Sequence, residues 1–229
     1  MGAAKVFYAA PPGSGGGGAA ASEQAVSHLL DTVAAETGAP AGSARARVVR
    51  YSDSFDLGRG RTALFMPLYV RSLHGLVHES HVAAPLPAAF LLRAATDVLR
   101  GLALLHAAGV AHCDVKADNI MFDGAGAATL IDLGAATRLG EATLEGAPEA
   151  LALGRDVSIA SAGVDLACLA STLWWAARRE VDAPAGATAD VLAAHADAAG
   201  GDPVMRAIAA ILRAASAAEA LAILAPAGA

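Results

Sequence analysis

The feature that most constrains the fold is a polar loop enclosed by apolar sequence. Residues 105–122 read LHAAGVAHCDVKADNIMF and place an acid, an ammonium and an amide at Asp114, Lys116 and Asn119. A carboxylate can accept a proton from a hydroxyl, an ammonium can neutralise a phosphoryl group, and an amide oxygen can bind Mg²⁺. The three groups can meet at one point only if the loop is held between packed elements.

The sequence on both sides of this loop predicts those elements. Apolar residues recur at helical spacing after Pro87, and Gly109 ends the predicted helix. Two short strands follow at residues 119–122 and 129–133, separated by a turn. Because a hairpin returns on itself, its far end brings Asp132 back beside the loop, which places two hard oxygen ligands at one site.

The first third of the chain predicts a small mixed lobe. We expect a strand at residues 5–9 and a helix at residues 22–35, where apolar side chains share one face. Residues 48–51 and 63–68 are typical of two further strands, joined by a turn-rich segment at residues 52–60. The sequence after residue 158 is mostly helical in pattern, so the larger lobe is predicted to be helical.

Composition excludes some classes of partner. The net charge of −6 does not favour nucleic acid, and no apolar run is long enough for a membrane span, so we expect neither partner. Only two cysteines are present, which favours a reducing, intracellular compartment, either cytoplasm or nucleus. Alanine occupies 62 of the 229 positions, and we expect much of it on the surface.

Three motifs in order resemble the eukaryotic protein kinases. The family pattern H-R-D-L-x-x-x-N, D-F-G and A-P-E stands here as HCDVKADN at residues 112–119, DLG at 132–134 and APE at 147–149. Asp165 stands where the family has an Asp that anchors the catalytic loop. The resemblance implies an α+β, two-lobed kinase-like fold in one domain, residues 1–229. Its reduced, β-rich N-lobe would span residues 1–68, and its mainly helical C-lobe residues 69–229.

The resemblance also implies an activity and its groups. The reaction would be transfer of the γ-phosphate of ATP, with Mg²⁺, to Ser/Thr hydroxyls of a protein substrate. Asp114 would be the catalytic base and Lys116 the partner of the γ-phosphate. Asn119 and Asp132 would be the metal ligands. Lysine two residues after the base resembles the serine/threonine class.

Five further residues are implied in nucleotide binding. The chain has only two lysines, Lys5 and Lys116, and Lys5 resembles the lysine of the family's V-A-I-K strand. Glu23, in the next predicted helix, would pair with Lys5. Met66 and Leu68 resemble residues of the strand leading into the adenine-binding hinge, and Met121 would lie under the adenine ring.

Departures from the family pattern leave a second function open. Only four residues precede Lys5, so the sequence lacks the Gly-x-Gly-x-x-Gly loop that covers the phosphates in the family. Residues 13–18 are glycine-rich but follow the lysine, and we interpret them as a linker. The alternative is a pseudokinase or kinase fragment that binds partners with weak or no catalysis. Aminoglycoside-type phosphotransferases, which share the Asp and Asn spacing, are a more distant alternative.

A histidine cluster offers a rival site of another kind. His74, His78 and His81 fall on one face of a predicted helix, a spacing that can bind a metal ion. They do not form the His-Glu-x-x-His pattern, because His81 comes one residue too early. We therefore interpret them as part of a solvated helix face.

Overall fold

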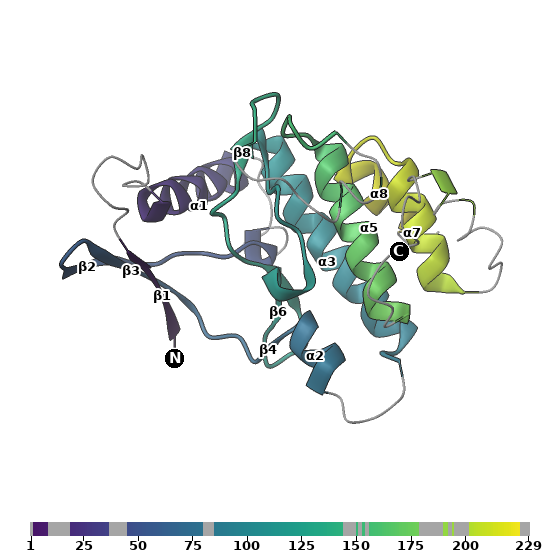
Figure 1. Ribbon diagram of the computed structural model, residues 1–229, viewed down its shortest axis with the longest axis horizontal. Helices are drawn as coiled ribbons and strands as arrows, with labels where there is room; N and C mark the ends of the chain where they lie inside the picture. Colours follow the sequence, from purple (N-terminus) through teal and green to yellow (C-terminus); the bar gives the residue numbers. More distant parts are fainter. Residues whose placement is uncertain are drawn as a thin grey trace.

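The computed structural model describes residues 2–8, 19–36, 45–79, 85–143, 156–178 and 202–224, together with positions 150, 153, 190, 191 and 194. A small sheet and one helix lie at one end of the molecule, and a group of helices forms the other (Figure 1). Within the described residues no helix is both long and apolar enough to cross a bilayer.

The sheet has three antiparallel strands in the order β1-β3-β2, namely β1 (Gly2–Tyr8), β2 (Ser54–Gly58) and β3 (Arg61–Pro67). Exposed and half-buried residues alternate along β1 from Gly2 to Phe7, as the two-residue period of a strand requires. This alternation puts Lys5 on the inner face, opposite Leu64 of β3. Helix α1 (Ala19–Glu36) follows β1 in the chain and contacts β3.

The predicted strand at residues 48–51 is wrong. Val48 makes one isolated bridge to Leu130, and the sheet partner of β3 comes instead from β2, inside the segment expected to be turns. Aspartates and glycines there are typical of turns, yet the actual turn is confined to Arg59 and Gly60, which both have positive φ. Pairing with β3 therefore outweighs the local turn preference.

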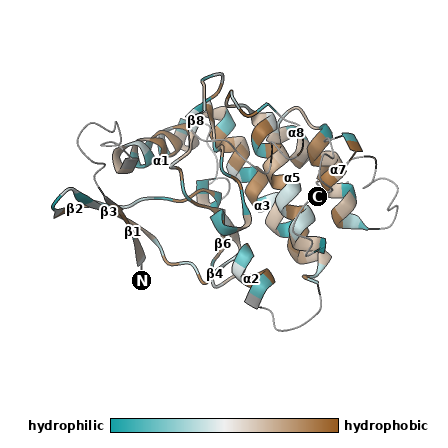
Figure 2. Ribbon diagram, in the orientation of Figure 1, coloured by the Kyte–Doolittle hydropathy of each residue, from teal (hydrophilic) through white to brown (hydrophobic). Residues whose placement is uncertain are grey.

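The helical region is built on α3 (Ala88–Ala107), which contacts α5 (Ala162–Arg178), α7 (Pro203–Arg213) and α8 (Ala217–Leu224). The residues of α3 that recur at the predicted helical spacing, Leu91, Ala95, Val98, Leu102 and Leu105, are all buried. Figure 2 shows hydrophobic residues along α3, α7 and α8 and hydrophilic ones at the tip of the β2–β3 hairpin.

Alanine is a core residue as well as a surface residue in these helices. The buried alanines lie where the helices pack on one another, at positions 94, 95, 167, 170, 176, 207, 209, 217 and 220. A methyl side chain lets helix axes approach closely, so the alanine excess contributes to packing. Alanine, expected on the surface, therefore also forms part of the core.

Short strands position the polar loop. β4 (Arg71–Ser72), β6 (Ile120–Phe122) and β7 (Ala128–Leu130) form one sheet, and β5 (Val110–Ala111) pairs with β8 (Thr137–Arg138). Helix α2 (Leu73–Glu79) follows β4, while 3-10 turns occupy η1 (Arg45–Arg47) and η2 (Ala117–Asn119). The predicted β6–β7 hairpin is confirmed, and β7 ends two residues before Asp132.

Gly101 tests the packing of α3 against η1. A Cβ atom at this position would lie 2.7 Å from the Arg47 carbonyl oxygen and 3.0 Å from Val48. Helix propensity alone predicts that Gly101→Ala stabilises by about 1 kcal/mol. We expect instead a loss of about 1–3 kcal/mol in the free energy of unfolding, measured by urea denaturation, because backbone must move.

Gly163→Ala is the matched control, since the nearest atom to its Cβ would be Ser161 Oγ at 3.8 Å. This variant should be as stable as the wild type or slightly more stable. Equal stability of the two variants would contradict the proposed close contact.

Candidate active site

A buried carboxylate on α5 anchors the polar loop. Asp165 is fully buried and accepts hydrogen bonds from the backbone amides of His112 and Cys113, each at 2.8 Å. His106 Nε2 lies 2.8 Å from the same carboxylate. Cys113 has φ of 62°, in the left-handed region that residues other than glycine seldom adopt. The helix α5 therefore fixes the start of the loop.

The His112 ring joins the loop to the segment after β7. The Asp114 amide donates to Nδ1 at 3.2 Å, and Nε2 lies 3.1 Å from the Ile131 carbonyl oxygen. Since Nδ1 accepts, Nε2 carries the proton and donates, so the ring is neutral. Burial lowers the pKa of His112, against the opposing effect of Asp165.

The three polar residues of the loop converge as predicted. Lys116 Nζ lies 2.9 and 2.7 Å from the two carboxylate oxygens of Asp114. Asn119 Nδ2 donates to the backbone carbonyl oxygen of Asp114 at 2.9 Å and to Asp114 Oδ2 at 2.8 Å. The amide nitrogen of Asn119 is thus used within the loop, which leaves its Oδ1 as the atom for a cation.

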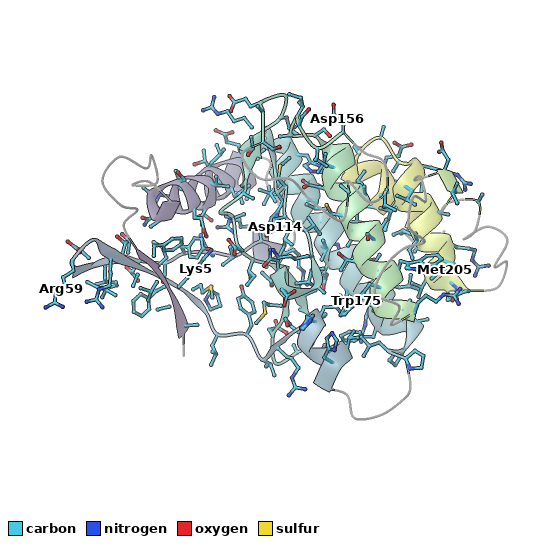
Figure 3. The ribbon with its side chains drawn as sticks, viewed as in Figure 1. Lys5, Arg59, Asp114, Asp156, Trp175 and Met205 are labelled. Carbon is cyan, nitrogen blue, oxygen red and sulfur yellow. The ribbon has the colours of Figure 1, made fainter. Side chains whose placement is uncertain are left out.

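Lys5 connects the sheet, α1 and the segment after β7. Its Nζ lies 2.6 Å from Glu23 Oε1 and 2.6 Å from Asp132 Oδ1, although Asp132 is 127 residues away in the chain. The pairing of Lys5 with Glu23 that the resemblance implied is present. Figure 3 shows Lys5 on the sheet side of the junction and Asp114 on the helical side.

Asp132 has left-handed backbone geometry, with φ of 66°, and its Oδ1 also accepts from the Gly134 amide at 3.2 Å. Burial raises the pKa of Asp132, but the hydrogen bond and charge of Lys5, with the Gly134 amide, outweigh burial and lower it. The carboxylate is therefore ionised at neutral pH. A Cβ on Gly134 would approach the Asp132 and Glu23 oxygens to 3.1 and 3.2 Å, so glycine suits this contact.

The three residues predicted to contact adenine lie on β3, directly after β3, and on β6. Met66 is half-buried in β3, and Leu68 is 53% exposed directly after it. Met121 lies in β6, whose neighbour Phe122 accepts a backbone hydrogen bond from Val70 at 2.8 Å. The segment after β3 therefore runs alongside the strand that carries Met121.

Two contacts of the site were not foreseen from the sequence. Tyr51, predicted only as a strand residue, donates its hydroxyl to Glu23 Oε2, and buried Arg45 bonds to Ser27 of α1. The one sequence signal that Tyr51 is buried was the pair of valines just before it in the VVRY segment, residues 48–51. A tertiary hydrogen bond leaves no periodicity in the sequence.

The histidine face is partly visible. His74 stacks on Trp175 with centroids 5.7 Å apart, and its Nδ1 lies 3.6 Å from Asp118 Oδ1. His81 is outside the described residues, and within them no three His, Cys, Asp or Glu side chains gather to hold a metal. The APE motif at 147–149 and the glycine-rich run at 13–18 also fall outside the described residues.

A family model described as "Protein kinase domain" matches residues 20–177, more than half of the chain. The chain belongs to the protein kinase domain family. The three motifs that predicted this family all lie within the matched region. The match supports protein phosphorylation in general as the family's reaction.

Curated relatives match over short segments. The chain is 42% identical over 43 residues to mitogen-activated protein kinase kinase kinase 17 of Arabidopsis thaliana, covering 19% of this chain and 12% of that protein. It is 35% identical over 79 residues to the probable serine/threonine-protein kinase pknA2 of Bifidobacterium longum, covering 34% and 10%. The aligned segments are therefore a small part of both relatives.

The solved structure of vaccinia related kinase 3 superposes with a TM-score of 0.56 at 18% identity, covering 69% of this chain and 52% of that one. This likeness shows the fold, which confirms the predicted α+β, kinase-like architecture.

The neutral His112 ring makes stability depend on pH. Its pKa in the folded state is below the ordinary value of 6.5, so the unfolded state binds more protons as the pH falls below 6.5. The free energy of unfolding should then fall by up to about 1.4 kcal/mol per pH unit, the one-proton limit. Urea denaturation between pH 7.5 and 5 measures this slope.

His112→Asn should flatten that slope even though the variant is less stable overall. The control is His28→Asn, at an exposed histidine of α1, which should keep the wild-type slope. If His112→Asn and the wild type lose stability in parallel over this range, His112 is not the buried neutral group we describe.

Proposed function

We propose that the chain transfers the γ-phosphate of ATP, with Mg²⁺, to Ser/Thr hydroxyls of an intracellular protein substrate. The observation that carries this proposal is the position of Lys5 Nζ, 2.6 Å from both Glu23 and Asp132. That contact joins the sheet and α1 to the segment after β7, which the His112 ring connects to the loop that holds the candidate base. Phosphoryl transfer depends mainly on positioning and charge, which such a junction supplies.

Asp114 is the proposed catalytic base. Its carboxylate is 24% exposed at the side chain, open enough to meet a hydroxyl, and is oriented by Lys116 and Asn119. Accepting the hydroxyl proton would raise the nucleophilicity of the attacking oxygen. Lys116, 2.7 Å from that carboxylate, would place a positive charge beside the transferred phosphoryl group.

The oxygen donors fit Mg²⁺. Asn119 Oδ1 and the ionised Asp132 carboxylate are hard ligands, and two protein ligands suit an ion that keeps waters and phosphate oxygens in its coordination sphere. When bound, Mg²⁺ neutralises charge on the phosphates. Asp132 and Asn119 would hold it, while Lys5 would bind a phosphate oxygen. Met66, Leu68 and Met121 would contact the adenine.

Preference for serine and threonine is supported by Lys116, which stands where the serine/threonine class has its lysine, and by the similarity to pknA2. A second candidate function is partner binding by a pseudokinase. The observation that favours it is that the glycine-rich run of this sequence, residues 13–18, follows Lys5, whereas the family's phosphate-covering loop comes before the corresponding lysine.

Replacing the base tests the catalytic proposal. Asp114→Asn should lower phosphate transfer by about a hundred- to ten-thousand-fold, the usual contribution of general base catalysis. Incorporation of label from γ-labelled ATP into a protein substrate measures this change. Asp53→Asn, at an exposed carboxylate beside β2, should retain wild-type incorporation. Equal incorporation by the Asp114 variant and the wild type would show that the base is wrongly assigned.

Measuring ATP binding distinguishes a kinase, or a pseudokinase that binds nucleotide, from a module that binds no nucleotide. ATP at about a hundred times its dissociation constant should raise the free energy of unfolding by about 2.7 kcal/mol. Most of that gain should need Mg²⁺ and should be lost on chelation or in Asp132→Asn. If ATP stabilises the protein equally with and without Mg²⁺, then Asp132 and Asn119 are not the metal ligands.

A further inference from the structure

Glu23 is a buried acid whose two oxygens are bound by different partners. The residue is fully buried on α1, and its Oε1 accepts from Lys5 at 2.6 Å. Its Oε2 accepts from the hydroxyl of Tyr51, which is itself only 3% exposed. A buried carboxylate is costly unless its oxygens are satisfied, so each partner matters to where the carboxylate sits.

Tyr51 contacts α1 at two levels one turn apart. Besides its hydroxyl contact with Glu23, its backbone amide donates to Ser27 Oγ at 3.3 Å. Residues 23 and 27 lie on the same helix face at i and i+4. Two contacts at that spacing define both the rotation and the axial position of α1 relative to the segment that carries Tyr51.

Arg45 ties the segment that carries Tyr51 to α1. Its Nη1 donates to the carbonyl oxygens of Val48 and Val49 at 2.9 and 3.1 Å, and its Nη2 donates to Ser27 Oγ at 2.9 Å. Its Nε lies 2.8 Å from Asp31 Oδ1 on α1. Tyr51 therefore stands on a segment whose backbone is tied to the same helix.

The Tyr51 hydroxyl stays a donor throughout the ordinary pH range. Burial raises its pKa, and the neighbouring Glu23 charge raises it further. A protonated hydroxyl facing an ionised carboxylate makes a charge-assisted hydrogen bond, which is stronger than a neutral one.

We propose that Tyr51 is a positioning residue: its hydroxyl holds Glu23 Oε2 so that Oε1 faces Lys5. Without the hydroxyl, the Glu23 carboxylate can rotate, and Lys5 keeps only its contact with the more exposed Asp132. The consequence for catalysis rests on the proposed function, because it requires Lys5 to bind a phosphate of ATP. The positioning itself does not.

The two lysines allow a test that needs no activity. Lys5 and Lys116 are the only lysines, so brief acylation of the folded protein followed by mass spectrometry gives their reactivity ratio, with Lys116 as the internal reference. In Tyr51→Phe, which removes only the hydroxyl, Lys5 should react about five- to ten-fold faster relative to Lys116, the scale of losing one ordinary hydrogen bond, because Lys5 keeps its contact with Asp132.

Three further variants make the result specific. Tyr69→Phe, at a half-buried tyrosine near Thr129, is the matched control and should leave the ratio unchanged. Glu23→Gln should raise the ratio, and Tyr51→Phe added to Glu23→Gln should raise it no further, because both changes act on one contact. An unchanged ratio in Tyr51→Phe, or additive effects in the double variant, would overturn the proposal.

Kinetics separate this proposal from the proposed function. If the wild type transfers phosphate, Tyr51→Phe should raise KM for ATP several-fold and leave KM for the protein substrate unchanged. An equal rise in both would indicate a general structural defect and contradict the positioning role. A wild type without transferase activity would refute the proposed function, while the lysine ratio would still decide the role of Tyr51.

Discussion

The ion pairs of Lys5 are the constraint on which the arrangement of the site depends. One ammonium, 28% exposed at the side chain, contacts a buried acid on α1 and a more exposed acid after β7. The consecutive elements β1 and α1 must meet a turn 127 residues beyond Lys5 for both contacts to form. The inner face of β1, the buried face of α1 and the left-handed turn at Asp132 each supply one of the three groups.

The helical region and the loop could be largely predicted from the sequence. The α3 pattern, the stop at Gly109 and the β6–β7 hairpin are local features, written in spacing and turn residues, and the structure contains all three. Glu23 and Leu30 are both fully buried on α1, and their spacing of seven residues places them on one face of the helix. Where periodicity determines the structure, the sequence is sufficient.

Strand β2 and the supports of the site could not be predicted in the same way. β2 contains residues typical of turns and forms a strand because β3 offers it a partner, which is a non-local cause. The contacts of Tyr51 and Arg45 with α1 depend on where helix and segment cross. No short-range sequence pattern indicates where they cross. The contact of Tyr51, predicted only as a strand residue, with Glu23 therefore could not be foreseen.

Charge balance within the site gives a physical reason for a divalent cation. Glu23, Asp114 and Asp132 bring three carboxylates to the junction, and Lys5 and Lys116 are already paired with them at 2.6 to 2.9 Å. Adding nucleotide phosphates would bring several negative charges to a place whose lysines are already paired. The proposed oxygen ligands at Asn119 and Asp132 would answer this excess of negative charge, because a bound Mg²⁺ would supply positive charge where carboxylate and phosphate would otherwise repel.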